Sequence, residues 1–264
     1  MSLIKRYAAL WLMALSLPLA AEVTVTVGAY NYPSIALIDE QGALRGLAGD
    51  VLEELNLRQD DYRFVFQETA PKRRYMDFQQ RRYDVILFES PDWSWQPHRH
   101  YATRAFLSDQ ELYVALAKPG RDESFFDDLQ SRALVAILGF HYGFAGNNPD
   151  DIKLTERFNI DLSHSHRRNL ELILADRPAA AEIAVVSRAY LATFKAQRPD
   201  DYQRLLVSER IDQHHDLVAI VHPQAPITAE TLESMIDLLV ADGTFAKLAA
   251  RYDILLYNGP QPGP

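Results

Sequence analysis

The sequence contains no cysteine, and its 264 residues include 11 glycines and 14 prolines. Without cysteine, the chain cannot form disulfides, hold iron–sulfur clusters or thiolate-bound zinc, or use a thiol as a nucleophile. Positive charge is also sparse, because 27 Lys and Arg residues face 36 Asp and Glu residues, and the cations are scattered. Nucleic-acid binding depends on clustered positive charge, so we expect no nucleic-acid partner.

Long hydrophobic runs are lacking after the first 21 residues. Residues 1–21 begin with Lys5 and Arg6, continue with an apolar run and end on two alanines, which predicts a signal peptide cleaved after Ala21. The run is shorter than the roughly 20 apolar residues of a membrane span. Loss of its two cations changes the formal net charge from −9 to −11. We therefore expect a soluble, periplasmic mature protein, with a disordered tail at 258–264, which is rich in Gly and Pro.

The remaining sequence has the composition of a globular protein, with 48% hydrophobic and 24% charged residues. Apolar alternation and short apolar runs predict strands, and apolar residues at helical spacing predict helices. The predicted strands cover 23–27, 64–66, 85–88, 112–117, 133–138, 183–186 and 217–221, and the predicted helices cover 51–55, 73–80, 169–175, 189–196, 232–240 and 245–252. The strand–helix order runs twice, which favours an α/β fold with mostly parallel sheets covered by helices.

Five segments occur in an order that resembles a known family. They are GAYNYP (28–33), PKRRYMDFQQRRYDVILFES (71–90), QPHRHYATRAFL (96–107), LYVALAKPG (112–120) and ADGTFAKLAARY (241–252). In this order and spacing they resemble the periplasmic solute-binding proteins of the polar amino acid transport family. The resemblance implies the two-lobed type II periplasmic binding fold.

The resemblance also implies how the chain divides. Lobe one would comprise 22–111 and 222–257, and lobe two would comprise 118–216. Two hinge strands, 112–117 and 217–221, would join the lobes. A ligand would bind between the lobes and close them, which agrees with the rule that open α/β sheets bind ligands beyond the carboxyl ends of their strands.

Arg99 is the residue that the resemblance places against a ligand carboxylate, since it lies between the predicted strand 85–88 and the ATRAF segment. A guanidinium suits this role because its planar fork of donors matches a carboxylate. Arg104 is the alternative for the same role. The alternative is that Arg99 is a surface arginine that contacts no ligand.

Further candidates follow the predicted strands, where side chains reach the sheet edge. For each of them a packing role, a solvated helix position or a plain turn is the alternative to a ligand contact. The predicted ligand-binding residues, besides Arg99, are Tyr30, Tyr32, Arg74, Glu89, Ser90, Trp93, Phe140, Tyr142 and Ser187, with Trp95 as a further ring near Trp93.

One departure from the family pattern concerns the run EIAVVS. Glu182 and Ser187 stand where amino acid binders have two aspartates, the second of which accepts hydrogen bonds from the ligand's ammonium. A neutral serine cannot supply that charge. The ligand is therefore expected to differ from a standard α-amino acid, or Glu89 supplies the missing acceptor.

These features predict an exported solute-binding protein for a small polar, carboxylate-bearing metabolite, either an amino acid or a relative of one. The partner would be a membrane transporter permease or a membrane-bound sensor, and we expect a monomer without enzymatic activity or cofactor. The eight histidines show no spacing that gathers three metal ligands, so we predict no metal site. The alternative is a periplasmic dehydratase of the cyclohexadienyl type on the same fold, with Glu182 as its acid or base.

Overall fold

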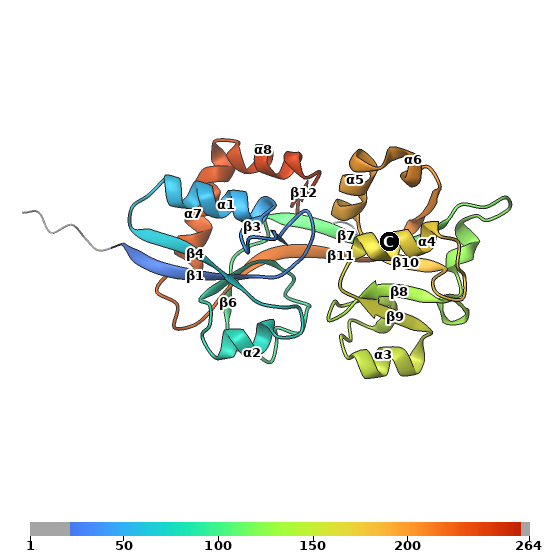
Figure 1. Ribbon diagram of the computed structural model, residues 1–264. Coiled ribbons are helices and arrows are strands. Elements are labelled where there is room, and N and C mark those ends of the chain that lie inside the picture. Colours follow the sequence, from blue (N-terminus) through green and yellow to red (C-terminus); the bar gives the residue numbers. More distant parts are fainter. Residues whose placement is uncertain (1–21, 260–264) are drawn as a thin grey trace, which may run out of the picture.

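The computed structural model describes residues 22–259 (Figure 1). The predicted signal peptide, 1–21, and residues 260–264 of the predicted tail lie outside the described residues. Within the described part, helices and strands form two groups on either side of a pair of long strands, β7 (Leu107–Leu116) and β11 (Leu205–Val221) (Figure 1). We name these groups the first and second lobe.

The first lobe contains three parallel strands in the order β4-β1-β5, and β11 continues this sheet in the antiparallel direction. Its strands are β1 (Val23–Ala29), β4 (Tyr62–Glu68), β5 (Val85–Glu89) and β6 (Tyr101–Ala102), with a separate hairpin of β2 (Leu37–Ile38) and β3 (Leu44–Arg45). Its helices are α1 (Leu47–Leu57), α2 (Arg74–Gln79), α7 (Ala229–Ala241) and α8 (Thr244–Arg251).

The second lobe contains parallel strands in the order β10-β8-β9, and β7 pairs antiparallel with β10. Its strands are β8 (Leu134–Ile137), β9 (Ile160–Ser163) and β10 (Ile183–Ser187). Its helices are α3 (Asp151–Arg157), α4 (His166–Leu174), α5 (Arg188–Gln197) and α6 (Pro199–Tyr202), with short 3-10 turns at Glu123–Phe126, Leu129–Ser131 and Gly143–Ala145. A short strand near the end of the chain, β12 (Leu255–Leu256), pairs with β7.

The local patterns explain these elements. Val25 and Val27 of β1 alternate with threonines and are buried, as the period-2 pattern predicts. Helix α7 begins after Thr228, whose hydroxyl accepts the backbone N–H of Thr231 at 3.2 Å, which is the usual role of a threonine at a helix N-cap. The α/β fold class predicted from the sequence is also confirmed. The hairpin β2–β3 and the short helices α3 and α6 were missed because their sequences are short and mostly polar.

The two expected hinge strands lie within the longer strands β7 and β11. The C-terminal part of β7 pairs with β10 and so belongs to the sheet of the second lobe. The C-terminal part of β11 pairs with β5 in the sheet of the first lobe. The two strands also pair with each other along the whole of β7, from Leu107–Leu217 to Leu116–Leu205, with register shifts around Ile211. Both lobes therefore share one continuous ribbon.

The apolar core also runs through both lobes. One cluster of buried residues extends from β1 and α1 through Tyr32, Trp93 and Phe140 to Leu134 in the second lobe. A second cluster covers the other face of the second lobe's sheet beneath α4 and α5. The lobes are thus in direct contact at the ends of their strands.

Candidate ligand site

The candidate site starts at the carboxyl ends of β1 and β5. In β5, Glu89 pairs with Val218 and Leu87 pairs with Ala219, so Phe88 is an extra residue opposite β11. Phe88 has a φ of 61°, in the left-handed region that non-glycine residues rarely occupy. A bulge of this kind redirects the side chains that follow it. It therefore sets the direction of Glu89 at the end of the strand.

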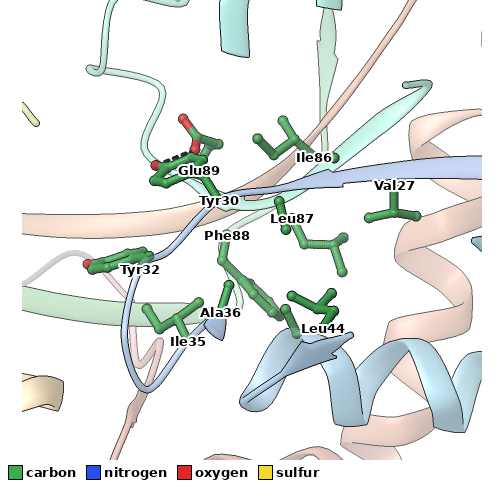
Figure 2. A pocket seen from close by; sticks show the side chains of 13 residues that line it. Val27, Tyr30, Tyr32, Ile35, Ala36, Leu44, Ile86, Leu87, Phe88 and Glu89 are labelled. Atoms are coloured by element: carbon green, nitrogen blue, oxygen red, sulfur yellow. Dashed lines mark hydrogen bonds between the residues drawn. The ribbon is translucent and has the colours of Figure 1, made fainter. Parts of the chain in front are cut away.

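Glu89 forms the centre of a buried ionic cluster. Its carboxylate accepts hydrogen bonds from the Tyr30 hydroxyl at 2.6 Å, Arg74 Nε at 3.0 Å and Trp95 Nε1 at 2.8 Å. Figure 2 shows the Tyr30–Glu89 contact beside a void of about 10 Å³, which is about the size of one water. Burial disfavours the charged form of Arg74, but Glu89 and the nearby Tyr30, Tyr75 and Tyr83 together outweigh this effect and raise the pKa of the guanidinium above its usual value. The charges in this cluster are already matched.

The interpretation of Arg74 as a solvated helix residue is therefore wrong, because its side chain is only 1% exposed. Its pairing with Glu89 affects whether Glu89 can replace the aspartate that the family has at the position of Ser187. Glu89 already receives the guanidinium and the Trp95 N–H at Oε2 and the Tyr30 hydroxyl at Oε1. These donors use three of the about four lone-pair sites of a carboxylate, so a ligand would have one remaining site, on Oε1.

A second carboxylate, Asp109 on β7, connects the two lobes. One of its oxygens accepts the Tyr32 hydroxyl from the first lobe at 3.0 Å, and the other accepts the backbone N–H of Ala189 at the start of α5 at 3.3 Å. Burial raises the pKa of Asp109 to about 6. Two positions further along β7, Glu111 is buried, its Oε2 has no hydrogen-bond partner among the described residues, and burial raises its pKa well above the usual value.

Aromatic and imidazole rings from both lobes meet in one cluster. Tyr32 of the first lobe packs edge-on against Trp93 at 5.9 Å and against Phe140 of the second lobe at 5.7 Å between ring centroids. Trp93 also contacts His141 and, at 4.7 Å, His215 of β11. Trp93 Nε1, His141 Nδ1 and His215 Nε2 are buried without a hydrogen-bond partner among the described residues. Burial lowers the pKa of both histidines to about 3, so they are neutral near pH 7.

Three other predicted site residues have structural contacts in this arrangement. The Ser187 hydroxyl accepts the Tyr190 N–H and begins α5. The Tyr142 hydroxyl accepts the backbone N–H of Ile137 at 2.6 Å, within the second lobe. Ser90 is buried, and its Oγ accepts the Asp92 N–H at 3.3 Å. Ser187 ends β10 and Ser90 directly follows β5, whereas Tyr142 lies in the segment after β8, and each of these three hydrogen bonds stays within one lobe.

Arg99 is not brought to this cluster. Its side chain is exposed and lines a surface pocket of about 320 Å³ together with His98, His222 and residues of the loop at 223–224. Arg104 lies on another surface, where it contacts Asp237 of α7. Neither guanidinium has a contact with the strand-end residues, so neither is placed to receive a carboxylate there.

Glu182 also lies elsewhere. It directly precedes β10, whereas Ser187 ends the same strand, so the two residues stand at opposite ends of β10. Glu182 accepts the backbone N–H of Ala133 at 3.1 Å and lies 3.5 Å from Arg132. The acid or base expected for a dehydratase is therefore directed away from the strand ends that face the first lobe.

A larger groove opens between the lobes beside the ring cluster. It has a volume of about 860 Å³ and is lined by the β1–β2 loop, β2 and β3 of the first lobe, by the start of α4, by one side of α5 from Tyr190 to Gln197, and by the end of α8. Sequence reasoning did not single out this groove, nor the roles of Asp109, His166 and His215. The signal available for Asp109 was the alternation of acidic residues in the LSDQELYV strand, where positions 109 and 111 share one face.

Among residues 22–259, no helix is long and apolar enough to cross a lipid bilayer. In the same range, His, Asp and Glu side chains form no group of three that could hold a metal ion.

The fold was compared with known proteins. No family model matches the sequence, and no curated protein matches it either. Solved structures do match. A histidine kinase sensor domain with similarity to periplasmic binding proteins superposes with a TM-score of 0.68 at 16% identity, over 90% of this chain and 99% of that chain. This chain has the type II periplasmic binding fold.

Two further structures show the range of proteins with this fold. An ABC uptake transporter substrate-binding protein from Streptococcus pneumoniae with bound histidine has a TM-score of 0.67 at 12% identity, over 87% of this chain and 92% of that chain. An ancestral amino acid-binding protein, described as a precursor of cyclohexadienyl dehydratase, has a TM-score of 0.65 at 15% identity, over 87% and 95% of the two chains. At these identities the likeness establishes the fold, and function must be argued from the site.

Proposed function

We propose that the protein is an exported solute-binding protein that captures a small polar, carboxylate-bearing metabolite between its two lobes. The observation that carries this proposal is the meeting of strand-end residues from both lobes around shared strands, where Tyr32 contacts Phe140 and Asp109. Among the similar structures with this fold, one is an ABC uptake transporter substrate-binding protein and another is a histidine kinase sensor domain. A permease or a membrane-bound sensor is accordingly the proposed partner.

The lobes would open and close about the ribbon of β7 and β11. We place the passage between the lobes at 107–111 and 212–217, a few residues before the positions expected from the sequence. The register shifts around Ile211 and between Val218 and Ala219 adjoin this passage. Irregular pairing allows bending with less loss of ladder hydrogen bonds than regular pairing, so these positions suit a hinge.

Binding would require at least partial opening, because the ring cluster fills the space at the strand ends. Opening would expose the unpaired nitrogen atoms of Trp93, His141 and His215 to a ligand. A buried polar group without a partner costs about 1 to 3 kcal/mol. A ligand that supplied partners for these atoms would therefore favour closure.

The experiment is a thermal-shift screen of the mature protein against amino acids, polyamines and dicarboxylates, followed by small-angle X-ray scattering with any compound that binds. A ligand at 100 times its dissociation constant should add about 2.7 kcal/mol of stability. The radius of gyration should decrease on binding, or stay at the closed value if the unliganded protein is already closed. An open scattering profile that persists at saturation would contradict capture between closing lobes.

The dehydratase remains a second candidate only through the ancestral precursor with the same fold. The position of Glu182 beside Arg132 removes the residue on which this candidate depended. Incubation with prephenate or arogenate tests it directly. Enzyme-dependent formation of an aromatic product would replace the binding-protein proposal with an enzymatic one.

A further inference from the structure

The groove between the lobes has its most polar feature at the start of α4. This helix runs from His166 to Leu174, and Ser165 precedes it as the cap, accepting the Arg168 N–H at 3.2 Å. The backbone N–H groups of His166 and Arg167, the first two of the helix, have no hydrogen-bond acceptor among the described residues. Free amides at a helix N-terminus favour an anion, because they point outward and carry the positive end of the helix dipole.

His166 gives a second, independent sign of a ligand. Its side chain is 1% exposed and lines the groove, yet neither ring nitrogen has a partner in the described part of the chain. The ring stacks on Tyr190 at 5.2 Å and packs edge-on against Phe140 at 5.9 Å, so packing fixes its plane. Burial lowers its pKa to about 3, which leaves a neutral ring with one N–H to donate. A buried imidazole normally finds a partner, so this ring lacks one that another molecule can supply.

The charges around the groove favour an anion as well. Its lining includes Arg45, Arg167 and Arg251, against one acidic residue, Asp253. Each arginine is held by a carboxylate outside the lining: Arg45 by Asp39 at 2.8 Å, Arg167 by Glu171 at 3.0 Å and Arg251 by Asp50 at 3.2 Å. These pairs position the guanidinium groups while their carboxylates stay away from the groove.

The opposite wall of the groove supplies hydroxyl groups and includes a contact between the two lobes. Ser34 of the first lobe donates to the Ala189 carbonyl at 3.1 Å and lies 2.8 Å from the Thr193 hydroxyl of α5. In Figure 1, α5 faces the end of α8 across the gap between the lobes, and residues of both helices line the groove. A molecule in the groove would thus contact both lobes at once. The volume of about 860 Å³ lies within the range of small-molecule sites and exceeds what a single small carboxylate fills.

We propose that this groove binds an organic anion, with the anion's carboxylate group at the start of α4, where His166 and the first two backbone amides donate hydrogen bonds to it. The proposal rests on the proposed function in that the solute lies between the lobes, and it adds the place and the partners of the carboxylate. It assigns to α4 the role that the sequence suggested for Arg99. Because residues of both lobes line the groove, an anion bound in it would favour closure.

The test is titration calorimetry of the mature protein with citrate, succinate and inorganic phosphate, with putrescine as the cationic counterpart. The carboxylates should bind, putrescine should not, and phosphate shows whether a phosphoryl group is accepted in place of a carboxylate. His166→Phe keeps the stacked ring and removes both nitrogen atoms, and it should weaken citrate binding by about tenfold or more. Circular dichroism and thermal unfolding would confirm that this variant is folded.

A matched pair of arginine variants covers the case in which His166→Phe does not fold. Arg167 lines the groove, while Arg168 is its neighbour on α4, pairs with Asp161 at 2.9 Å and does not line the groove. Arg167→Gln should weaken citrate binding by about threefold or more, and Arg168→Gln should leave it within about twofold.

The outcomes separate the two proposals. If a solute binds and compacts the protein with equal affinity in wild type, His166→Phe and Arg167→Gln, the proposed function stands and the groove assignment is overturned. If phosphate binds while citrate and succinate do not, the carboxylate assignment is overturned. If no compound of either panel binds at millimolar concentration, both proposals fail.

Discussion

Removal of Arg74 tests the buried cluster around Glu89, because both side chains are 1% exposed. Arg74→Met keeps most of the apolar stem and deletes the guanidinium that lies 3.0 Å from the carboxylate. The Tyr30 and Trp95 hydrogen bonds to Glu89 would remain, but they carry no charge. Breaking a buried pair by removing one partner costs about 3 to 5 kcal/mol, because the other charge is left uncompensated. For a protein of this size that corresponds to a decrease in Tm of about 6 to 20 °C.

The assay is urea unfolding of the mature protein followed by tryptophan fluorescence. Of the three tryptophans, one lies in the predicted signal peptide, so Trp93 and Trp95 would report the transition. Trp95 is bonded to Glu89, which places a reporter in the cluster. Arg104→Met is the matched control, because Arg104 and its partner Asp237 are both nearly half exposed, and it should change stability by less than about 1 kcal/mol.

The double variant Arg74→Met/Glu89→Gln separates the loss of a partner from the loss of packing. Glutamine is neutral and still offers an acceptor to the Tyr30 hydroxyl. It should therefore recover a large part of the stability lost in the single variant, since replacing both charges of a buried pair is often nearly neutral. If Arg74→Met unfolds at the same urea concentration as Arg104→Met, the reasoning about this cluster is refuted.

Three further predictions concern other parts of the chain. Burial raises the pKa of Asp109 to about 6, so the stability of the wild type should fall as the pH rises from about 4 through 6, and Asp109→Asn should reduce this fall by up to about 3 kcal/mol in unfolding curves at several pH values. Glu111 and Asp212, whose pKa values are also raised, contribute in the same direction in both proteins. Identical pH profiles of the two proteins would argue against a raised pKa of Asp109. Gly143→Ala should lower the free energy of unfolding by at least about 1 kcal/mol, because its Cβ would lie 2.3 Å from the Asp212 carbonyl oxygen, and an unchanged Tm would contradict this close approach. Intact-mass measurement of the exported protein should show a chain beginning after Ala21, and recovery of the full-length mass would disprove the predicted cleavage.

The sequence by itself determined the elements whose patterns are local. The alternation in β1, the apolar run of β5 and the Thr228 cap of α7 depend on neighbours within a few residues, so they could be predicted without a fold. The order of these elements and the five quoted segments led to the type II periplasmic binding fold. The strand-end positions of Tyr30, Tyr32 and Glu89 followed from the same local reasoning, and the structure brings them to one edge of the first lobe's sheet.

Only the tertiary structure decided how these residues are used. Arg74 looked solvated in its helix, but packing buries it against Glu89, which lies 15 residues further along the chain. Arg99 and Arg104 carry the same charge and lie on the surface, because the chain after β5 leads them away from the strand ends. Burial, pairing and the loss of partners are properties of contacts between distant segments. No local pattern could therefore distinguish the neutralised Glu89 from His166, which lines a groove formed by both lobes and whose ring nitrogens have no partner among the described residues.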